Sequence, residues 1–275
     1  MSFRGDVGAW ATPLENMLDM NPQVVARCVD NRDPSAPIFA GDLGTQRLVG
    51  LLGFAGLRAT SMGLMRLQVG LDPTFAVNTF DTGTVSTWPV DATAGEYDAW
   101  GRWTLSGVYQ EDEYLALGMP RVFLPTSRVW MQYFRVQFID PCARDPLSIG
   151  VFTAADIWEP AVNFKYDWDY TPVDESDITR VPRGSSFVDE RGIRRKLNIG
   201  FDQLDEDTGE PWARAFGTML RTGRSVPMWV IPFSDTGQIT RWEKAAVYGL
   251  ISVDSVLSNP FVGRYAMPVT IDQLY

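Results

Sequence analysis

Short runs of alternating apolar and polar residues recur along the chain, separated by turns that contain glycine and proline. Because neighbouring side chains of a strand point to opposite faces, such alternation predicts strands with one buried face. The 18 prolines and 24 glycines are scattered rather than clustered, which is typical of many short strands joined by turns. The pattern therefore predicts a mainly β protein. Strands are expected within residues 38–40, 48–54, 65–69, 102–105, 121–124, 130–140, 149–158, 163–170, 196–201, 225–233, 245–256 and 264–271.

One segment has helical spacing instead. Asp207 or Thr208 can cap a helix N-terminus, Pro211 fits a first turn, and Thr222-Gly223 supplies a stop signal. The sequence therefore predicts one α-helix over residues 208–222, between two strands. Its apolar face would consist of Trp212, Ala215, Phe216, Met219 and Leu220.

The chain is expected to hold an arm and two domains. Residues 1–20 have a weak pattern, with one short helical turn at Leu14, Met17 and Leu18, and predict an N-terminal arm that docks on another surface. A boundary near Pro160 separates a first β domain, 21–160, from a second, 161–275, that carries the helix.

Two local signals refine the predicted strands. Gly41-Asp42-Leu43-Gly44 separates the expected strands 38–40 and 48–54. Pro268 lies within the final strand, and since proline lacks a backbone N–H, this strand is expected at a sheet edge or at a bulge.

Composition limits the classes of partner. The 275 residues are 45% hydrophobic and carry a net charge of −10, so the chain is a folded protein that does not attract nucleic acid or anionic membranes nonspecifically. Apolar runs stop well short of the roughly 20 residues of a bilayer span. Residues 1–10 lack the order of a signal peptide. We expect synthesis in the cytoplasm, without a membrane anchor.

Catalysis and cofactors are not expected. Histidine is absent, which excludes the Ser-His-Asp, Cys-His and His-metal mechanisms. Cys28 and Cys142 are too few for a disulfide framework and are expected to be reduced thiols. No calcium-binding loop or phosphate-binding loop is present. The one enzymatic alternative is glycoside hydrolysis by a carboxylate pair, with candidates Asp167, Asp169, Asp174 and Glu175.

Two groups of residues are candidate contact sites. Aromatic side chains between residues 85 and 125 could stack on sugar rings while Asp91, Glu96 and Asp98 accept hydroxyl hydrogen bonds, or could pack under a loop or against a neighbouring subunit. These aromatic candidates are Trp88, Tyr97, Trp100 and Trp103. A local basic cluster could be solvated hairpin charge or could complement an identical subunit. It consists of Arg180, Arg183, Arg191, Arg194 and Arg195.

The first half of the chain resembles the discoidin or galactose-binding jelly roll. The resemblance rests on the Asp42-Leu43-Gly44 turn, the strand Arg66-Leu67-Gln68-Val69 and the strands WMQYFRVQFID (130–140) and IGVFTAADIW (149–158). It implies a jelly-roll β-sandwich over residues 21–160. A carbohydrate-binding module that contacts host surface glycans is the alternative function that we consider.

The second half resembles the β-sandwich-plus-helix unit of the distal tail and tail-tube proteins of long-tailed bacteriophages. The resemblance rests on the order of NFKYDWDY (163–170), RRKLNIGF (194–201), the predicted helix, MWVIPF (228–233), VYGLISV (247–253) and the strand that begins at Arg264-Tyr265. It implies a structural virion protein that forms a ring at the distal end of the tail tube. The implied partners are further copies of the chain, as a hexamer or trimer, the tail tube protein and the tail hub or baseplate proteins.

Overall fold

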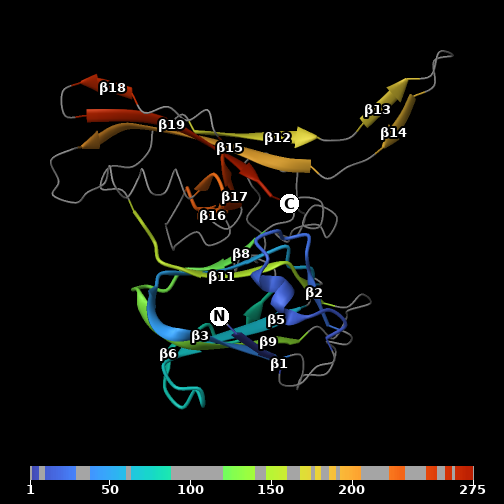
Figure 1. Cartoon of the computed structure of the whole chain (residues 1–275), viewed down its shortest axis with the longest axis vertical. Helices are drawn as coiled ribbons and strands as arrows, with labels where there is room; N and C mark the ends of the chain where they lie inside the picture. The colour runs from blue at the N-terminus through green and yellow to red at the C-terminus, as the bar shows by residue number, and fades with distance from the viewer. Residues whose placement is uncertain are drawn as a thin grey trace, which may run out of the picture. The chain divides into compact units, whose positions relative to one another are not determined.

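The computed structural model describes fourteen parts of the chain (Figure 1). They are residues 2–5, 10–28, 38–59, 63–87, 120–139, 147–159, 168–174, 177–180, 186–189, 193–205, 223–232, 246–252, 258–261 and 264–274. The chain forms two compact units. Unit 1 comprises residues 1–157 with 232–245, and unit 2 comprises residues 158–231 with 246–275.

In its described residues, unit 1 contains two larger antiparallel sheets. The first has the order β1-β3-β9-β5-β6, with β7 also paired to β5, and the second has the order β11-β4-β8. The short strands β2 and β10 make a separate pair. The strands are β1 (Ser2–Gly5), β2 (Ala26–Arg27), β3 (Ile38–Val49), β4 (Leu51–Ala55), β5 (Leu64–Gly70), β6 (Asn78–Asp81), β7 (Val85–Ser86), β8 (Arg121–Phe123), β9 (Val129–Ile139), β10 (Ser148–Ile149) and β11 (Val151–Ala155).

Aromatic side chains from both sheets fill the core of unit 1. Phe134 of β9 and Phe152 of β11 lie with ring centroids 4.6 Å apart, and Phe54 of β4 meets Phe138 of β9 edge-on at 6.0 Å. Phe39 of β3 is completely buried among them. Because each sheet buries one face against the other, unit 1 is a β-sandwich.

The segment predicted as an N-terminal arm packs within unit 1. Strand β1 pairs with β3, Ser2 lying opposite Asp42. The predicted helical turn is a 3₁₀ helix, η1 (Leu14–Leu18), which buries Leu14 and Met17 in the sandwich core. The surface on which this segment docks is therefore its own unit.

The predicted turn at Gly41–Gly44 is wrong, because β3 continues through it. The pairing of β3 with β9 shifts register between Asp42 and Arg47, so the extra residues form a bulge. The Asp42 carboxylate accepts the Gly44 backbone N–H at 2.7 Å, and Gly44 has φ +77°, which favours glycine.

The predicted strand 149–158 is divided into two strands with different partners, β10 with β2 and β11 with β4. β10 ends at Ile149 and β11 begins at Val151. A Cβ on Gly150 would overlap the Pro22 carbonyl oxygen and lie 2.8 Å from that of Ala55. Since backbone atoms cannot move aside, only glycine allows the chain to pass here.

Unit 2 contains one larger sheet and one hairpin among its described residues. The sheet has the order β12-β15-β19-β17-β16, with β18 also paired to β19, and β13 pairs with β14. Leu197, Ile199 and Phe201 alternate along β15 into the core of this unit. The strands are β12 (Asp169–Asp174), β13 (Asp177–Arg180), β14 (Ser186–Asp189), β15 (Ile193–Asp205), β16 (Met228–Val230), β17 (Val247–Ile251), β18 (Ser258–Phe261) and β19 (Arg264–Gln273).

The final strand lies inside the sheet, so the expectation that Pro268 marks an edge or a bulge is wrong. β19 pairs with β15 on one side and with β17 and β18 on the other. On that second side, β17 pairs with β19 from Ile271 onward, and β18 pairs with β19 only up to Ala266. Pro268 lies between these two paired parts of β19, where no described strand would accept a hydrogen bond from a backbone N–H at this position.

The mainly β prediction is confirmed, with very little helix in the described residues. The predicted helix over 208–222 lies outside them. The finer assignments, a jelly roll followed by a tail-tube-like sandwich, stay predictions. A search for long apolar helices that could cross a membrane finds none in the described parts.

Phe39→Ala should lower the free energy of unfolding of unit 1 by about 3–5 kcal/mol, because it leaves a cavity where buried rings meet. Phe39 contacts Trp10, Phe134, Phe138 and Phe152, all with centroids within 6.3 Å. Urea denaturation followed by tryptophan fluorescence measures the change. The control Val77→Ala alters a side chain that is 75% exposed and should stay within about 0.5 kcal/mol of wild type. Equal losses in both variants would contradict this account of the core.

Candidate functional site

The outward face of the larger sheet of unit 1 carries a row of polar side chains. On β9, Arg135 alternates with the buried Phe134 and Val136, and on β5, Gln68 alternates with buried Leu67 and Val69. The register places Gln68 opposite Asp81 of β6 on one side and opposite Arg135 on the other. Three adjacent strands therefore present neighbouring polar groups away from the core.

Hydrogen bonds connect this row into one network. Arg66 donates two hydrogen bonds to the Asp81 carboxylate, from Nε to Oδ1 at 3.0 Å and from Nη2 to Oδ2 at 2.6 Å. The Gln68 side-chain amide donates to Asp81 Oδ2 at 3.0 Å. Arg135 donates from Nε and Nη2 to Gln68 Oε1 at 3.1 and 2.6 Å. The four side chains thus hold one another in fixed orientations.

Asp81 is the electrostatic centre of the network. Its hydrogen bonds with Arg66 have the largest effect, and they lower the pKa of the carboxyl group from 3.8 to about 2, with smaller contributions from the Gly83 N–H and Gln68. Partial burial opposes this shift. Asp81 is therefore ionised at every physiological pH, and the network presents a carboxylate fixed by the Arg66 guanidinium and by Gln68, which separates it from Arg135.

An aromatic side chain closes one end of the network. The guanidinium carbon of Arg135 lies 5.0 Å from the Phe75 ring centroid, within the range of a cation–π contact. Phe75 has φ +56°, which is unusual for a residue with a side chain. The preceding turn holds this conformation, since Asp72 accepts hydrogen bonds from the Thr74 N–H (3.1 Å) and, through its carbonyl, from the Phe75 N–H (3.1 Å).

A second aromatic side chain stands exposed beside β6. Trp130, near the start of β9, is 54% exposed, whereas the next residue, Met131, is buried. The Thr79 hydroxyl of β6 donates to the Trp130 carbonyl oxygen at 2.9 Å and ties the two strands together. We name the set the aromatic–polar surface: Arg66, Gln68, Phe75, Asp81, Trp130 and Arg135. The buried positions of β9 step from Met131 to Phe134, three residues rather than two, so the alternation shifts there, and Trp130 and Arg135 both lie at positions off the core. They are five positions apart, about 17 Å, so the surface is an open strip.

The aromatic residues that the sequence suggested as a glycan or subunit contact are not in the described parts of the chain. Trp88, Tyr97, Trp100 and Trp103 lie in the interval 88–119, as do Asp91, Glu96 and Asp98. Their role stays a prediction.

The predicted arginine cluster is described only in part. Arg183 and Arg191 lie outside the described residues, and Arg180 ends β13. Arg194 and Arg195 are neighbours on β15, so their side chains leave opposite faces of the sheet. Arg194 is exposed, whereas Arg195 is half-buried and bound to Gln273 at 2.9 Å. These two arginines do not present one flat charged patch.

The carboxylates of the enzymatic alternative are likewise only partly described. Asp167 and Glu175 lie outside the described residues, and for Asp174 only the strand position is described. Asp169 accepts a hydrogen bond from the Asn198 amide at 2.6 Å. In the described parts, no group of three Asp, Glu or Cys side chains is placed to hold a metal ion. Cys28 is buried, and Cys142 is not described.

Sequence reasoning did not single out the aromatic–polar surface. It identified Arg66-Leu67-Gln68-Val69 and residues 130–140 as strands, without asking which side chains faced outward. The signal was available in the second strand, where Trp130 and Arg135 occupy non-core positions. Phe75 and Asp81 carried no comparable signal in the sequence. Phe75 lies in the loop between β5 and β6, and Asp81 reaches the surface through the pairing of β6 with β5.

Comparison with known proteins gives similar solved structures and no relatives. No protein-family model and no curated protein matches the chain. CBM32-1 from a family 31 glycoside hydrolase of Clostridium perfringens is 10% identical, with 56% of this chain and 94% of that chain covered and a TM-score of 0.36. The CBM32 of AlyQ in complex with 4,5-unsaturated mannuronic acid is 14% identical, with coverage of 57% and 95% and a TM-score of 0.37.

A third structure, truncated AlyQ with CBM32 and alginate lyase domains, is 13% identical. The alignment covers 76% of this chain and 48% of that chain, with a TM-score of 0.35. At TM-scores of 0.35 to 0.37, these three likenesses establish no family for the chain.

The Asp81 network should make unit 1 sensitive to acid. Its carboxyl pKa is lower in the folded chain than its ordinary 3.8, so the stabilisation is complete above pH 4 and is lost as pH falls towards 2. Asp81→Asn should cost about 1 kcal/mol at pH 7 and should flatten the decline between pH 4 and 2. Urea midpoints at pH 7, 4, 3 and 2.5 measure both effects.

The matched control for this prediction is Asp156→Asn. Asp156 pairs with Arg128 at 3.1 Å, but both side chains are more than half exposed, so its removal should change stability by less than about 0.5 kcal/mol. The interpretation of the Asp81 network is wrong if Asp81→Asn leaves the acid profile of wild type unchanged.

Proposed function

We propose that unit 1 is a carbohydrate-binding β-sandwich and that the aromatic–polar surface is its binding site. The observation that carries this proposal is the exposed Trp130 beside hydrogen-bonded polar side chains on a rigid sheet. Tryptophan is enriched at contact sites, because its ring offers a large apolar face and its N–H can bond to a polar partner.

The chemistry of this surface suits a sugar. A saccharide ring has an apolar C–H face that stacks on an aromatic ring and a rim of hydroxyl groups that donate and accept hydrogen bonds. Trp130 and Phe75 offer aromatic faces, the Asp81 carboxylate accepts, and the guanidinium groups of Arg66 and Arg135 donate. The net charge of −10 argues against a nucleic-acid ligand for the same surface.

An open strip also favours a chain over a compact ligand. Small-molecule sites are usually concave and bury most of the ligand. The aromatic–polar surface instead follows β9 for about 17 Å between Trp130 and Arg135. We therefore assign it to a glycan chain, such as those on a host cell surface.

A second proposal concerns the assembly of unit 2. Among the described strands of its larger sheet, β12 and β16 are outermost. Outer strands can pair with strands of another copy. This supports the hypothesis that the chain forms a ring at the distal end of a phage tail tube, made in the host cytoplasm and assembled into the virion. The proposed partners are the tube protein and the hub or baseplate proteins, and no catalytic role is proposed.

The edge-strand support for the ring is partial. β16 belongs to the predicted strand 225–233 and is outermost among the described strands, whereas β15, which contains Leu197–Phe201, lies between β12 and β19. β12 covers β15 only from Ile193 to Asn198, so pairing between copies would involve β16, β12 or the part of β15 beyond Asn198, which no described strand pairs on the β12 side. A glycan-binding unit 1 on an assembled unit 2 would combine both proposals in one tail-tip protein.

Trp130→Ala should lower glycan affinity about tenfold or more, because it removes the exposed stacking face. A glycan array identifies the ligand, and isothermal titration calorimetry measures the affinities of the variants. Met20→Ala is the control, since Met20 is an apolar side chain with 47% exposure in another part of unit 1. Trp100→Ala tests the sequence-based candidates in parallel. Loss of binding in Trp100→Ala but not in Trp130→Ala would move the site to the interval 88–119.

Purified full-length chain should form a closed oligomer of fixed size if the ring proposal holds. Size-exclusion chromatography with light scattering gives its mass, and electron microscopy gives its symmetry. Thr171→Lys places a charge on the outer strand β12 and should dissociate an oligomer that pairs there. The control is Thr45→Lys at an exposed position of unit 1. A chain that stays monomeric at high concentration would contradict the ring.

A further inference from the structure

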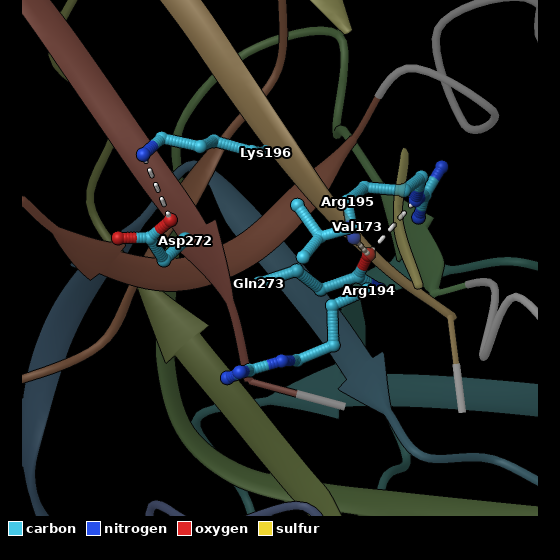
Figure 2. A pocket seen from close by; sticks show the side chains of 6 residues that line it. All are labelled: Val173, Arg194, Arg195, Lys196, Asp272 and Gln273. Carbon is cyan, nitrogen blue, oxygen red and sulfur yellow. Dashed lines mark hydrogen bonds and ion pairs between the residues drawn. The ribbon is translucent and has the colours of Figure 1, made fainter. Parts of the chain in front are cut away.

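A small pocket lies on unit 2, where β12, β15 and β19 run side by side (Figure 2). Its volume is ≈ 250 Å³, room for about eight water molecules. Three of its lining side chains are cationic and one is anionic, in a chain whose net charge is −10. The lining residues are Val173 from β12, Arg194, Arg195 and Lys196 from β15, and Asp272 and Gln273 from β19.

One side of the pocket is rigid. The Arg195 backbone N–H and Nε both donate to Gln273 Oε1, at 3.1 and 2.9 Å, and Nη2 donates to the Ala246 carbonyl at 3.4 Å. Gln273 is only 1% exposed. The Arg195 side chain leaves the opposite face of β15 from Arg194 and Lys196, so these bonds fix the strand that forms the pocket wall, and the Arg195 guanidinium is not itself a ligand group.

On the other side of the pocket, Lys196 can exchange its ion-pair partner. Lys196 Nζ lies 3.9 Å from Asp272 Oδ1, near the outer limit of an ion pair, and these side chains are 39% and 49% exposed. An exposed pair of this kind stabilises a protein by only about 0.2–1 kcal/mol. Lys196 can therefore turn from Asp272 to another anion at little cost.

The positive and negative charges are unevenly distributed in the pocket. Figure 2 shows Lys196 and Arg194 on either side of Val173 and Gln273, with the Asp272 carboxylate beside Lys196 alone. Arg194 and Lys196 leave the same face of β15, because they are two residues apart. Positive charge thus surrounds a space whose wall is completed by the apolar Val173.

We propose that this pocket binds an oxyanion, that is, a carboxylate or phosphate group. The Arg194 guanidinium matches the geometry of both kinds of group, and the Lys196 ammonium group adds a mobile point charge. Asp272 would compete with the ligand for Lys196. The site lies on unit 2 and goes beyond the proposed glycan surface of unit 1, so either can fail without the other.

The test is isothermal titration calorimetry of the full-length chain with sodium phosphate and, separately, sodium glucuronate, in a buffer low in chloride. At least one probe should bind saturably in the millimolar range. Lys196→Gln should weaken that binding about tenfold, and Asp272→Asn should strengthen it several-fold, because the competing carboxylate is gone. A gain of affinity in Asp272→Asn cannot result from misfolding.

The control is Arg47→Gln, which removes one exposed positive charge from unit 1 and should leave the affinity unchanged. Binding of phosphate alone assigns the site to phosphate groups, and binding of glucuronate alone assigns it to carboxylates. Saturable binding of neither probe overturns the proposal. Unchanged affinity in Lys196→Gln or Asp272→Asn, or an equal loss in Arg47→Gln, overturns it as well.

Discussion

The contact between Phe134 of β9 and Phe152 of β11 is the constraint on which unit 1 depends, because it joins the two sheets of the sandwich. Alternation along β9 then follows. With Phe134, Val136 and Phe138 in the core, Arg135 must point outward. A slip of one residue would exchange the faces of the strand. The register that builds the core therefore also presents the aromatic–polar surface.

The magnitudes indicate what the polar network contributes. The Arg66–Asp81 pair is partly exposed, with side chains 44% and 24% accessible, so it stabilises the fold by about 1 kcal/mol at most. A buried ring such as Phe39 contributes about 3–5 kcal/mol. The network is thus secondary for stability. Its larger consequence is that Gln68 and Arg135 keep fixed positions on a sheet, which lowers the entropy cost of binding a ligand there.

Sequence pattern predicts the strands well where one face is buried. Residues 65–69, 130–140 and 196–201 correspond to β5, β9 and part of β15, because apolar and polar residues alternate along 65–69, 134–138 and 196–201. It fails at Gly41–Gly44, where a hydrogen bond from the Gly44 backbone N–H to the Asp42 carboxylate lets the strand continue as a bulge. It fails at Pro268 because two different partner strands divide one side of β19, which is a property of the whole sheet.

The candidate site was less predictable than the fold for a related reason. Phe75 meets Arg135 across 60 positions of sequence, and its conformation depends on the Asp72 turn. No local period encodes such a contact. Aromatic composition directed attention to residues 88–103, whereas the exposed Trp130 stands within a strand whose other residues have the ordinary alternation of a core element.

Charge distinguishes the two proposed ligands physically. A neutral glycan approaches unit 1 without electrostatic cost, whereas an oxyanion is repelled by a chain of net charge −10. That repulsion is screened over about 8 Å at physiological ionic strength. Lys196 and Arg194 lie on one face of β15 and line a single pocket with Asp272, so within it their attraction for an anion outweighs the repulsion of Asp272 and of the distant acidic residues. The net charge should therefore slow the arrival of an anion more than it weakens the bound state.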